Sequence, residues 1–140
     1  MEWQGVYDLH QDERQIAAVQ KATLTTEEYG IEPTHGLFGS ETWWEQIADG
    51  RLPTETLRGT VSRVYMGSMG DWPEFEMICK GGAIERFTRH QTPADGSQDR
   101  LYQTGKQIEV DTVWQEARRN APDWGLPRLR RTVLRIRIQA

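Results

Sequence analysis

The sequence predicts one α+β domain in which two short N-terminal helices pack on a small five-stranded antiparallel β-barrel. Two observations support this fold class. Apolar residues recur at helical spacing before residue 54, and after it they alternate with polar residues in short runs. A chain of 140 residues has the usual length of one domain. We therefore expect a single domain, 1–140, that consists of a helical, acidic N-terminal segment (1–54) and a β-barrel (55–140).

The first helix is expected over residues 12–23. Asp12 is a residue type that commonly caps the N-terminus of a helix, because its carboxylate accepts hydrogen bonds from the first free backbone N–H groups. Ile16 and Val19 then lie three residues apart, which gives this segment one apolar side.

The second helix is expected over residues 41–49. Ser40 precedes it as a second capping residue, and Gly50 follows it as a typical C-terminal residue. Trp43 and Ile47 lie four residues apart and therefore on one face of this helix. We expect this apolar face to cover one end or face of the sheet.

Five runs after residue 54 have the period of two that is typical of strands. The strands are expected at residues 57–66, 74–79, 83–89, 108–114 and 133–138. Gly81 and Gly82 can supply positive φ angles for a tight hairpin between the second and third strands. One face of the fourth strand is expected to carry Ile108, Val110, Thr112 and Trp114.

The strand count and the glycines near the middle of the first strand resemble the pattern of an OB-fold, with an SH3-like barrel as the alternative. In the OB-fold order, the turns Asp71-Trp72-Pro73 and Asp123-Trp124-Gly125 fall in the loops after the first and fourth strands. Those are the loops through which OB-folds bind oligonucleotides or oligosaccharides. The resemblance concerns architecture, and no diagnostic sequence motif accompanies it.

The net charge of −4 conceals an uneven distribution along the chain. Residues 1–54 are strongly acidic, whereas residues 118–137 contain seven arginines and a single acidic residue, Asp123. Such segregated charge has two interpretations. The two segments can neutralise each other within the molecule, or the arginines can bind a partner.

Several classes of function are disfavoured by the sequence. No apolar run is long enough to span a membrane, the N-terminus lacks the pattern of a signal peptide, and Cys79 is the only cysteine. We therefore expect a cytoplasmic protein without a disulfide. A bacterial or phage origin is a further expectation, which these observations do not test. The three histidines have no metal-ligand spacing, and no catalytic constellation is evident. We expect no metal, no cofactor and no enzymatic activity.

Large aromatic residues in turns are the best sequence evidence for a binding site. Trp and Arg are the commonest anchors of protein interfaces, which makes Trp72 and Trp124 candidates. The candidate binding residues are Trp72, Trp124, Asp71, Tyr65, Arg128, Arg130 and Arg135. The structural alternative is that the two indoles fold back over the barrel mouth, and that the arginines of the last strand only protect an edge from aggregation.

The favoured function is therefore non-catalytic binding of another protein, as an inhibitor or an immunity-type protein. The alternative is an OB-like protein that binds single-stranded nucleic acid, with aromatic side chains on the bases and arginines on the phosphates. A net negative charge argues against that alternative, because phosphate neutralisation supplies most non-specific affinity. An unrecognised enzyme is a more distant alternative.

Overall fold

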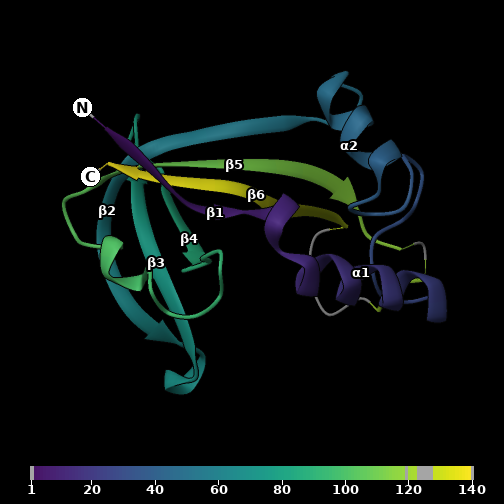
Figure 1. The fold of residues 1–140 in the computed structure, drawn as a ribbon, viewed down its shortest axis with the longest axis horizontal. Helices are drawn as coiled ribbons and strands as arrows, with labels where there is room; N and C mark the ends of the chain where they lie inside the picture. The colour runs from purple at the N-terminus through teal and green to yellow at the C-terminus, as the bar shows by residue number, and fades with distance from the viewer. Residues whose placement is uncertain (1, 119, 123–127, 140) are drawn as a thin grey trace. The chain divides into compact units, whose positions relative to one another are not determined.

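The computed structural model describes residues 2–118, 120–122 and 128–139. Within these residues the chain forms two α-helices and six β-strands, so the predicted α+β class is confirmed (Figure 1). The helices are α1 (Glu13–Thr25) and α2 (Glu41–Ala48). The strands are β1 (Trp3–Asp8), β2 (Thr54–Gly67), β3 (Trp72–Cys79), β4 (Ile84–Thr88), β5 (Gln107–Glu116) and β6 (Leu129–Gln139). No helix among the described residues is long and apolar enough to cross a membrane.

The strands form one open sheet in the order β1-β6-β5-β2-β3-β4. The pairs β1–β6, β2–β3 and β3–β4 are antiparallel. The prediction of a five-stranded barrel, OB-like or SH3-like, is therefore wrong in strand number and in closure. The additional strand is β1, within the segment that was expected to be helical. Its register with β6 shifts between Gly5 and Tyr7, and this irregularity obscures the alternation by which a strand is recognised.

Both predicted helix N-caps are confirmed. The carboxylate of Asp12 accepts a hydrogen bond from the backbone N–H of Gln15 at 3.1 Å. The hydroxyl of Ser40 accepts one from the backbone N–H of Trp43 at 3.3 Å. Gly50 has a φ of +75° just after α2, where the left-handed conformation favours glycine.

The antiparallel ribbon of β2, β3 and β4 depends on glycines at two places. Gly81 and Gly82 have φ angles of +97° and +95° in the turn between β3 and β4, as the sequence predicted. At Gly59 the backbone of β3 comes so close that an added Cβ would lie 2.2 Å from the carbonyl oxygen of Ile78. The ladder of β2 with β3 shifts between Val61 and Arg63, and such a bulge increases the local bend and twist of a strand.

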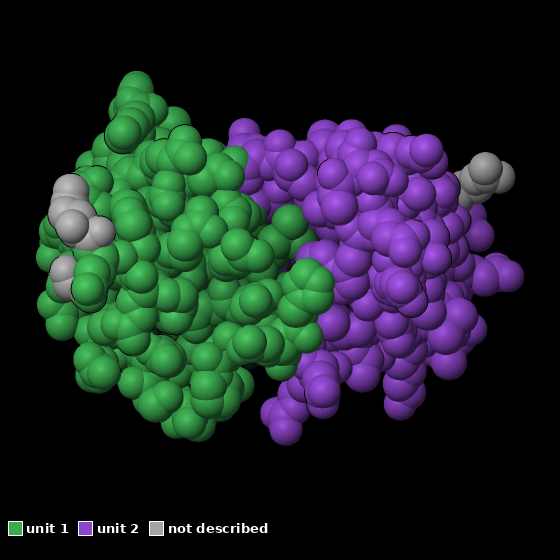
Figure 2. Space-filling view, turned by 45° about the horizontal axis from the view of Figure 1, so that its top comes forward, with its two compact units in different colours: residues 1–11, 56–111, 134–140 green, residues 12–55, 112–133 purple. Residues whose placement is uncertain are grey.

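The described chain contributes to two compact units, which Figure 2 distinguishes by colour. The first unit comprises residues 1–11, 56–111 and 134–140. Its buried side chains include Val6, Val61, Phe75, Met77, Phe87, Ile108, Val110 and Ile136. The loop after β4 reaches β1 within this unit, since the backbone N–H of Thr92 donates to the carbonyl oxygen of Val6 at 2.9 Å.

The second unit comprises residues 12–55 and 112–133. Its largest buried side chain is Trp43 of α2, in accordance with the core position expected from the sequence. The indole Nε1 of Trp43 donates to Oε1 of the buried Gln115 on β5 at 3.0 Å. The Nε2 of Gln115 in turn donates to the carbonyl oxygen of Glu32 at 3.1 Å, so this hydrogen-bond network joins three segments of the unit.

Candidate functional site

One face of the β2–β3–β4 ribbon is exposed or half-buried along its length, and we call it the outer face. Successive side chains of a strand point to opposite faces, and Phe75, Met77 and Phe87 are buried on the other face of this ribbon. The strand registers align its members across the three strands. The outer face consists of Thr60, Arg63, Tyr65, Trp72, Glu74, Glu76, Ile78, Ile84, Arg86 and Thr88.

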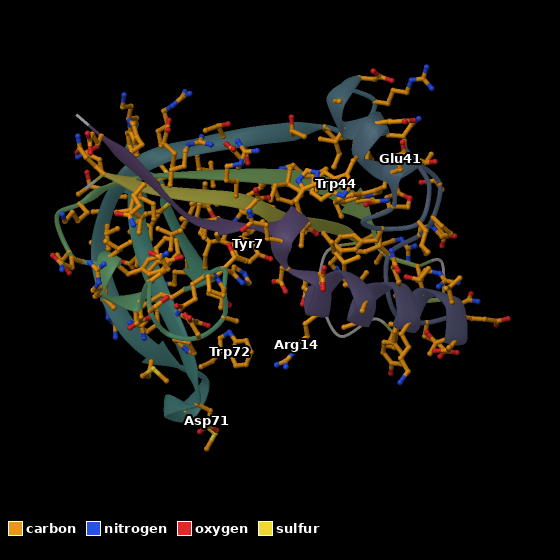
Figure 3. The ribbon with its side chains drawn as sticks, viewed as in Figure 1. Tyr7, Arg14, Glu41, Trp44, Asp71 and Trp72 are labelled. Carbon is orange, nitrogen blue, oxygen red and sulfur yellow. The ribbon has the colours of Figure 1, made fainter. Side chains whose placement is uncertain are left out.

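Trp72 is the most prominent aromatic of the outer face. It is the first residue of β3 rather than a turn residue, and it is 53% exposed. Its Nε1 donates a hydrogen bond to Oγ1 of Thr88 on β4 at 2.8 Å. Asp71 is exposed beside it at the tip of the β2–β3 hairpin, as Figure 3 shows. The exposed Met69 belongs to the same tip and has a φ of +62°, a conformation that is uncommon for a residue with a side chain.

Tyr65 lies half-buried on β2 and is enclosed by charged neighbours. The guanidinium carbon of Arg63 lies 4.3 Å from the centre of the Tyr65 ring, within the range of a cation–π contact. Burial raises the pKa of the Tyr65 hydroxyl, and the carboxylate of Glu74 raises this pKa further. Tyr65 is therefore a neutral aromatic surface at physiological pH.

The central charges of the outer face neutralise each other. The Nε of Arg86 donates to Oε2 of Glu76 at 3.0 Å, and the hydroxyl of Ser62 donates to Oε1 at 3.0 Å. The Ser62 and Arg86 hydrogen bonds hold the pKa of Glu76 below its usual value. Since these charges are already paired, the exposed apolar groups are the features of this face best suited to bind a protein.

An apolar pair lies further along the same face. Ile78 and Ile84 are opposite each other in the register of β3 and β4, and they are 45% and 57% exposed. The sequence analysis did not single out either residue. The available signal was an isoleucine on the strand face that otherwise carries Glu74 and Glu76, since a solvated face usually carries polar residues throughout.

The arginines that the sequence proposed for binding have different environments. Arg128 is exposed, and its Nη2 donates to the carbonyl oxygen of Arg118 at 3.2 Å. Arg135 is exposed and lines a pocket in the first unit with Asp8. Arg130 is half-buried and lines a pocket in the second unit. Trp124 lies outside the described residues.

The candidates are therefore divided between the two units. Tyr65, Asp71 and Trp72 share the β2–β3 hairpin of the first unit, whereas Arg128 and Arg130 belong to the second. Part of the positive charge of the arginine-rich segment is neutralised internally. Arg137 pairs with Glu109 at 3.3 Å and with Asp111 at 3.0 Å, both on β5, and Arg118 pairs with Glu32 of the acidic segment at 3.5 Å.

An exposed, hydrogen-bonded tryptophan beside apolar side chains is typical of surfaces that bind other proteins. The model of the family described as Immunity protein RhsI2 matches residues 3–139, and the chain therefore belongs to this family. Its role is that of an immunity protein, which acts through interaction with a partner protein, a toxin. This confirms the interpretation of the sequence as an immunity-type binding protein. No curated protein matches the chain in sequence.

Proposed function

We propose that the chain neutralises its partner toxin by non-catalytic binding, and that the outer face and the adjoining tip of the β2–β3 hairpin form the contact surface. The observation that carries the proposal is Trp72. The residue is 53% exposed, and its indole is held by a hydrogen bond to Thr88. A large aromatic side chain that is ordered before binding loses little conformational entropy on association, which favours affinity.

The neighbours of Trp72 support this assignment. Met69 and the Ile78–Ile84 pair provide exposed apolar surface on the same ribbon. Tyr65 and Arg63 add an aromatic and a guanidinium group, two groups that are frequent at interface centres. The paired charges of Glu76 and Arg86 would form polar contacts around this apolar surface.

The proposal assigns no catalytic step to the chain. Among the described residues, no group of three or more His, Cys, Asp or Glu side chains is arranged to hold a metal ion. Binding alone is sufficient for neutralisation where it covers a toxin's active site or blocks a movement that the toxin needs.

The experiment is a binding measurement against the protein encoded by the gene adjacent to that of this chain, taken as the candidate toxin. Trp72→Ala should raise Kd at least about tenfold, because truncation of an interface anchor commonly costs about 2 kcal/mol. Trp3→Ala is the matched control, since Trp3 is an exposed tryptophan of β1, outside the outer face. Melting temperatures of the free proteins separate binding from folding. If Trp72→Ala binds the toxin as tightly as the wild type, the outer face is not the contact surface.

The same proteins distinguish the alternative of single-stranded nucleic-acid binding. A fluorescent oligonucleotide titrated at low salt should show no saturable binding, since Arg137 is already paired with Glu109 and Asp111. Binding that weakens steeply as salt increases would instead favour the nucleic-acid function.

A further inference from the structure

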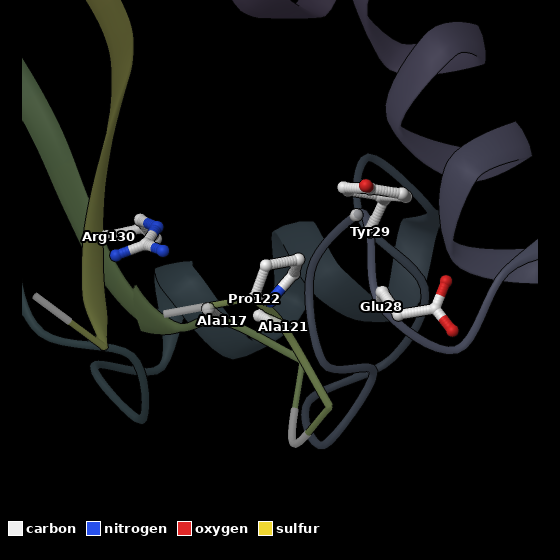
Figure 4. A pocket seen from close by; sticks show the side chains of 7 residues that line it. Glu28, Tyr29, Ala117, Ala121, Pro122 and Arg130 are labelled. Carbon is white, nitrogen blue, oxygen red and sulfur yellow. The ribbon is translucent and has the colours of Figure 1, made fainter. Parts of the chain in front are cut away.

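A pocket in the second unit is lined by a charged side chain, that of Arg130, which forms no ion pair with another described residue. The pocket has a volume of about 200 Å³ and is partly open to solvent. Its lining residues are Glu28, Tyr29, Gly30, Ala117, Ala121, Pro122 and Arg130, and Figure 4 shows Tyr29 and Arg130 on opposite walls. All of them belong to the second unit. We call this the Tyr29–Arg130 pocket.

The wall that carries Tyr29 is held in place by several contacts. Arg118 donates from Nη1 to the carbonyl oxygens of Thr23 at 2.7 Å and Tyr29 at 3.3 Å. An isolated antiparallel bridge joins Ile31 to Ala117. Gly30 has a φ of +88°, and an added Cβ there would lie 2.2 Å from Oγ1 of Thr23. These contacts therefore fix the position of the wall that carries Tyr29.

Arg130 differs from three other arginines of its segment, Arg118, Arg131 and Arg137. Its Nη1 is buried and has no hydrogen-bond partner among the described residues. By contrast, Arg118, Arg131 and Arg137 each form an ion pair with a carboxylate. Glu28, the acidic residue of the lining, directs its carboxylate away from Arg130 in Figure 4. No ion pair between described residues includes Arg130, so its charge is not compensated within them.

A buried charged donor without an acceptor is costly for the free protein. A carboxylate is its natural complement, because the two oxygens match the planar fork of a guanidinium group. The remaining lining from Ala117, Ala121 and Pro122 suits the aliphatic stem of a side chain. The volume is below the roughly 300–1,000 Å³ of pockets for drug-sized ligands, which favours a single side chain as the occupant.

We infer that the Tyr29–Arg130 pocket receives one acidic side chain, Asp or Glu, of the toxin. This inference rests on the proposed function, since it names a chemical feature of the same partner. It assigns the toxin a contact in the second unit, whereas the outer face belongs to the first. Arg130 provides charge recognition there, whereas Trp72 provides apolar contact on the β2–β3 hairpin.

The test compares Arg130→Met with the matched control Arg128→Met, and the probe is the protein encoded by the gene adjacent to that of this chain, taken as the candidate toxin. Arg130→Met should raise Kd about tenfold or more, while the melting temperature of the free protein stays the same or increases, because the variant removes an uncompensated buried charge. Arg128→Met should change Kd less than about threefold, as expected for an exposed charge. A fall of both affinity and melting temperature in Arg130→Met would assign Arg130 a structural role and overturn the inference.

A double-mutant cycle identifies the acidic partner. Each Asp and Glu of the toxin is replaced by Ala and measured against the wild type and Arg130→Met. One replacement should be strongly non-additive with Arg130→Met, and the others should be additive. Additivity of all of them would overturn the inference while leaving the proposed function intact. Absence of any binding by the wild-type chain would instead overturn the proposed function, and the inference with it.

Discussion

The indole Nε1 of Trp72 donates a hydrogen bond to Oγ1 of Thr88, across β3 and β4, at a distance of 2.8 Å. Thr88 is opposite Glu74 in the register, so the indole extends diagonally over the neighbouring strand. An exposed tryptophan usually has several accessible orientations. This hydrogen bond selects one of them before any partner is present.

The first prediction concerns this preorganisation. Thr88→Val preserves the shape of the side chain and removes the acceptor for Trp72. We expect toxin affinity to fall about three- to tenfold, since an ordinary hydrogen bond contributes about 1 kcal/mol and the indole must then be ordered on binding. The melting temperature should change little. Thr104→Val, at an exposed loop position, is the control, and equal affinities of the two variants would refute the prediction.

A second prediction follows from the close approach of β2 and β3 at Gly59. A Cβ at this position would lie 2.2 Å from the carbonyl oxygen of Ile78 and 2.9 Å from Cα of Cys79. Both are backbone atoms, so the strands themselves would have to separate. Gly59→Ala should therefore lower the free energy of unfolding by about 2 kcal/mol or more, measured by urea denaturation.

Gly5→Ala is the control for Gly59→Ala. Gly5 is also a strand glycine, yet an added Cβ would meet no atom within 4 Å. We expect this variant to be neutral or slightly more stable, because alanine reduces the conformational entropy of the unfolded chain. Equal destabilisation by the two substitutions would show that the close approach of β3 at Gly59 is not the cause of the lost stability.

A third prediction concerns the hydrogen bond between Trp43 and Gln115. Both side chains are buried, and the Nε1–Oε1 distance is 3.0 Å. Trp43→Phe leaves the Gln115 oxygen without this donor and creates a small void, so a loss of about 2–3 kcal/mol of unfolding free energy is expected. If the pair acts as a unit, the double variant Trp43→Phe/Gln115→Met loses less than the sum of the single variants. If thermal denaturation shows that the double variant loses as much stability as the two single variants together, the two side chains do not act as a unit.

Local signals were sufficient to predict much of the fold. Asp12 and Ser40 cap their helices, and Gly81 and Gly82 form the expected hairpin, because caps and tight turns depend on a few neighbouring residues. The strand β1 was missed because its bulge interrupts the period of two. The sequence also could not show whether the sheet closes into a barrel, since closure depends on pairing between strands that are far apart along the chain.

The face of β5 shows a second limit of periodicity. Ile108, Val110 and Thr112 are buried as expected. After Thr112 the alternation shifts by one residue, so Val113 and Gln115 are buried and Trp114 is not. The change occurs where β5 passes from residues of the first unit to residues of the second, between 111 and 112. A strand that contributes to two cores need not keep one buried face.

The sequence predicted only part of the candidate site. Trp72 was conspicuous because a tryptophan between an aspartate and a proline is unusual for a buried strand. The importance of Arg130 could not be separated from that of the other arginines, since their ion pairs involve partners far away in the sequence. Arg118, for example, pairs with Glu32, and only the fold brings these two residues together.

The last prediction concerns the acid stability of the charged cluster around Glu109. Glu109 accepts a hydrogen bond from Nε of Arg58, and its Oε1 lies 3.3 Å from Nε of Arg137. The Arg58 hydrogen bond, followed by that of Arg137, holds the pKa of Glu109 below its usual value. A carboxyl group whose pKa is lower in the folded state stabilises the fold above its unfolded pKa of about 4.3, and this contribution is lost as pH falls through the folded pKa.

Glu109→Gln should accordingly lower the melting temperature at pH 7, and the difference from the wild type should shrink as pH falls below about 4. Thermal denaturation at pH values from 7 to 3 measures this dependence. Glu116→Gln, at an exposed position of the same strand, should show a smaller difference at pH 7. A Glu109→Gln difference that persists undiminished at the lowest pH would mean that shape, rather than the charge on Glu109, accounts for its effect on stability.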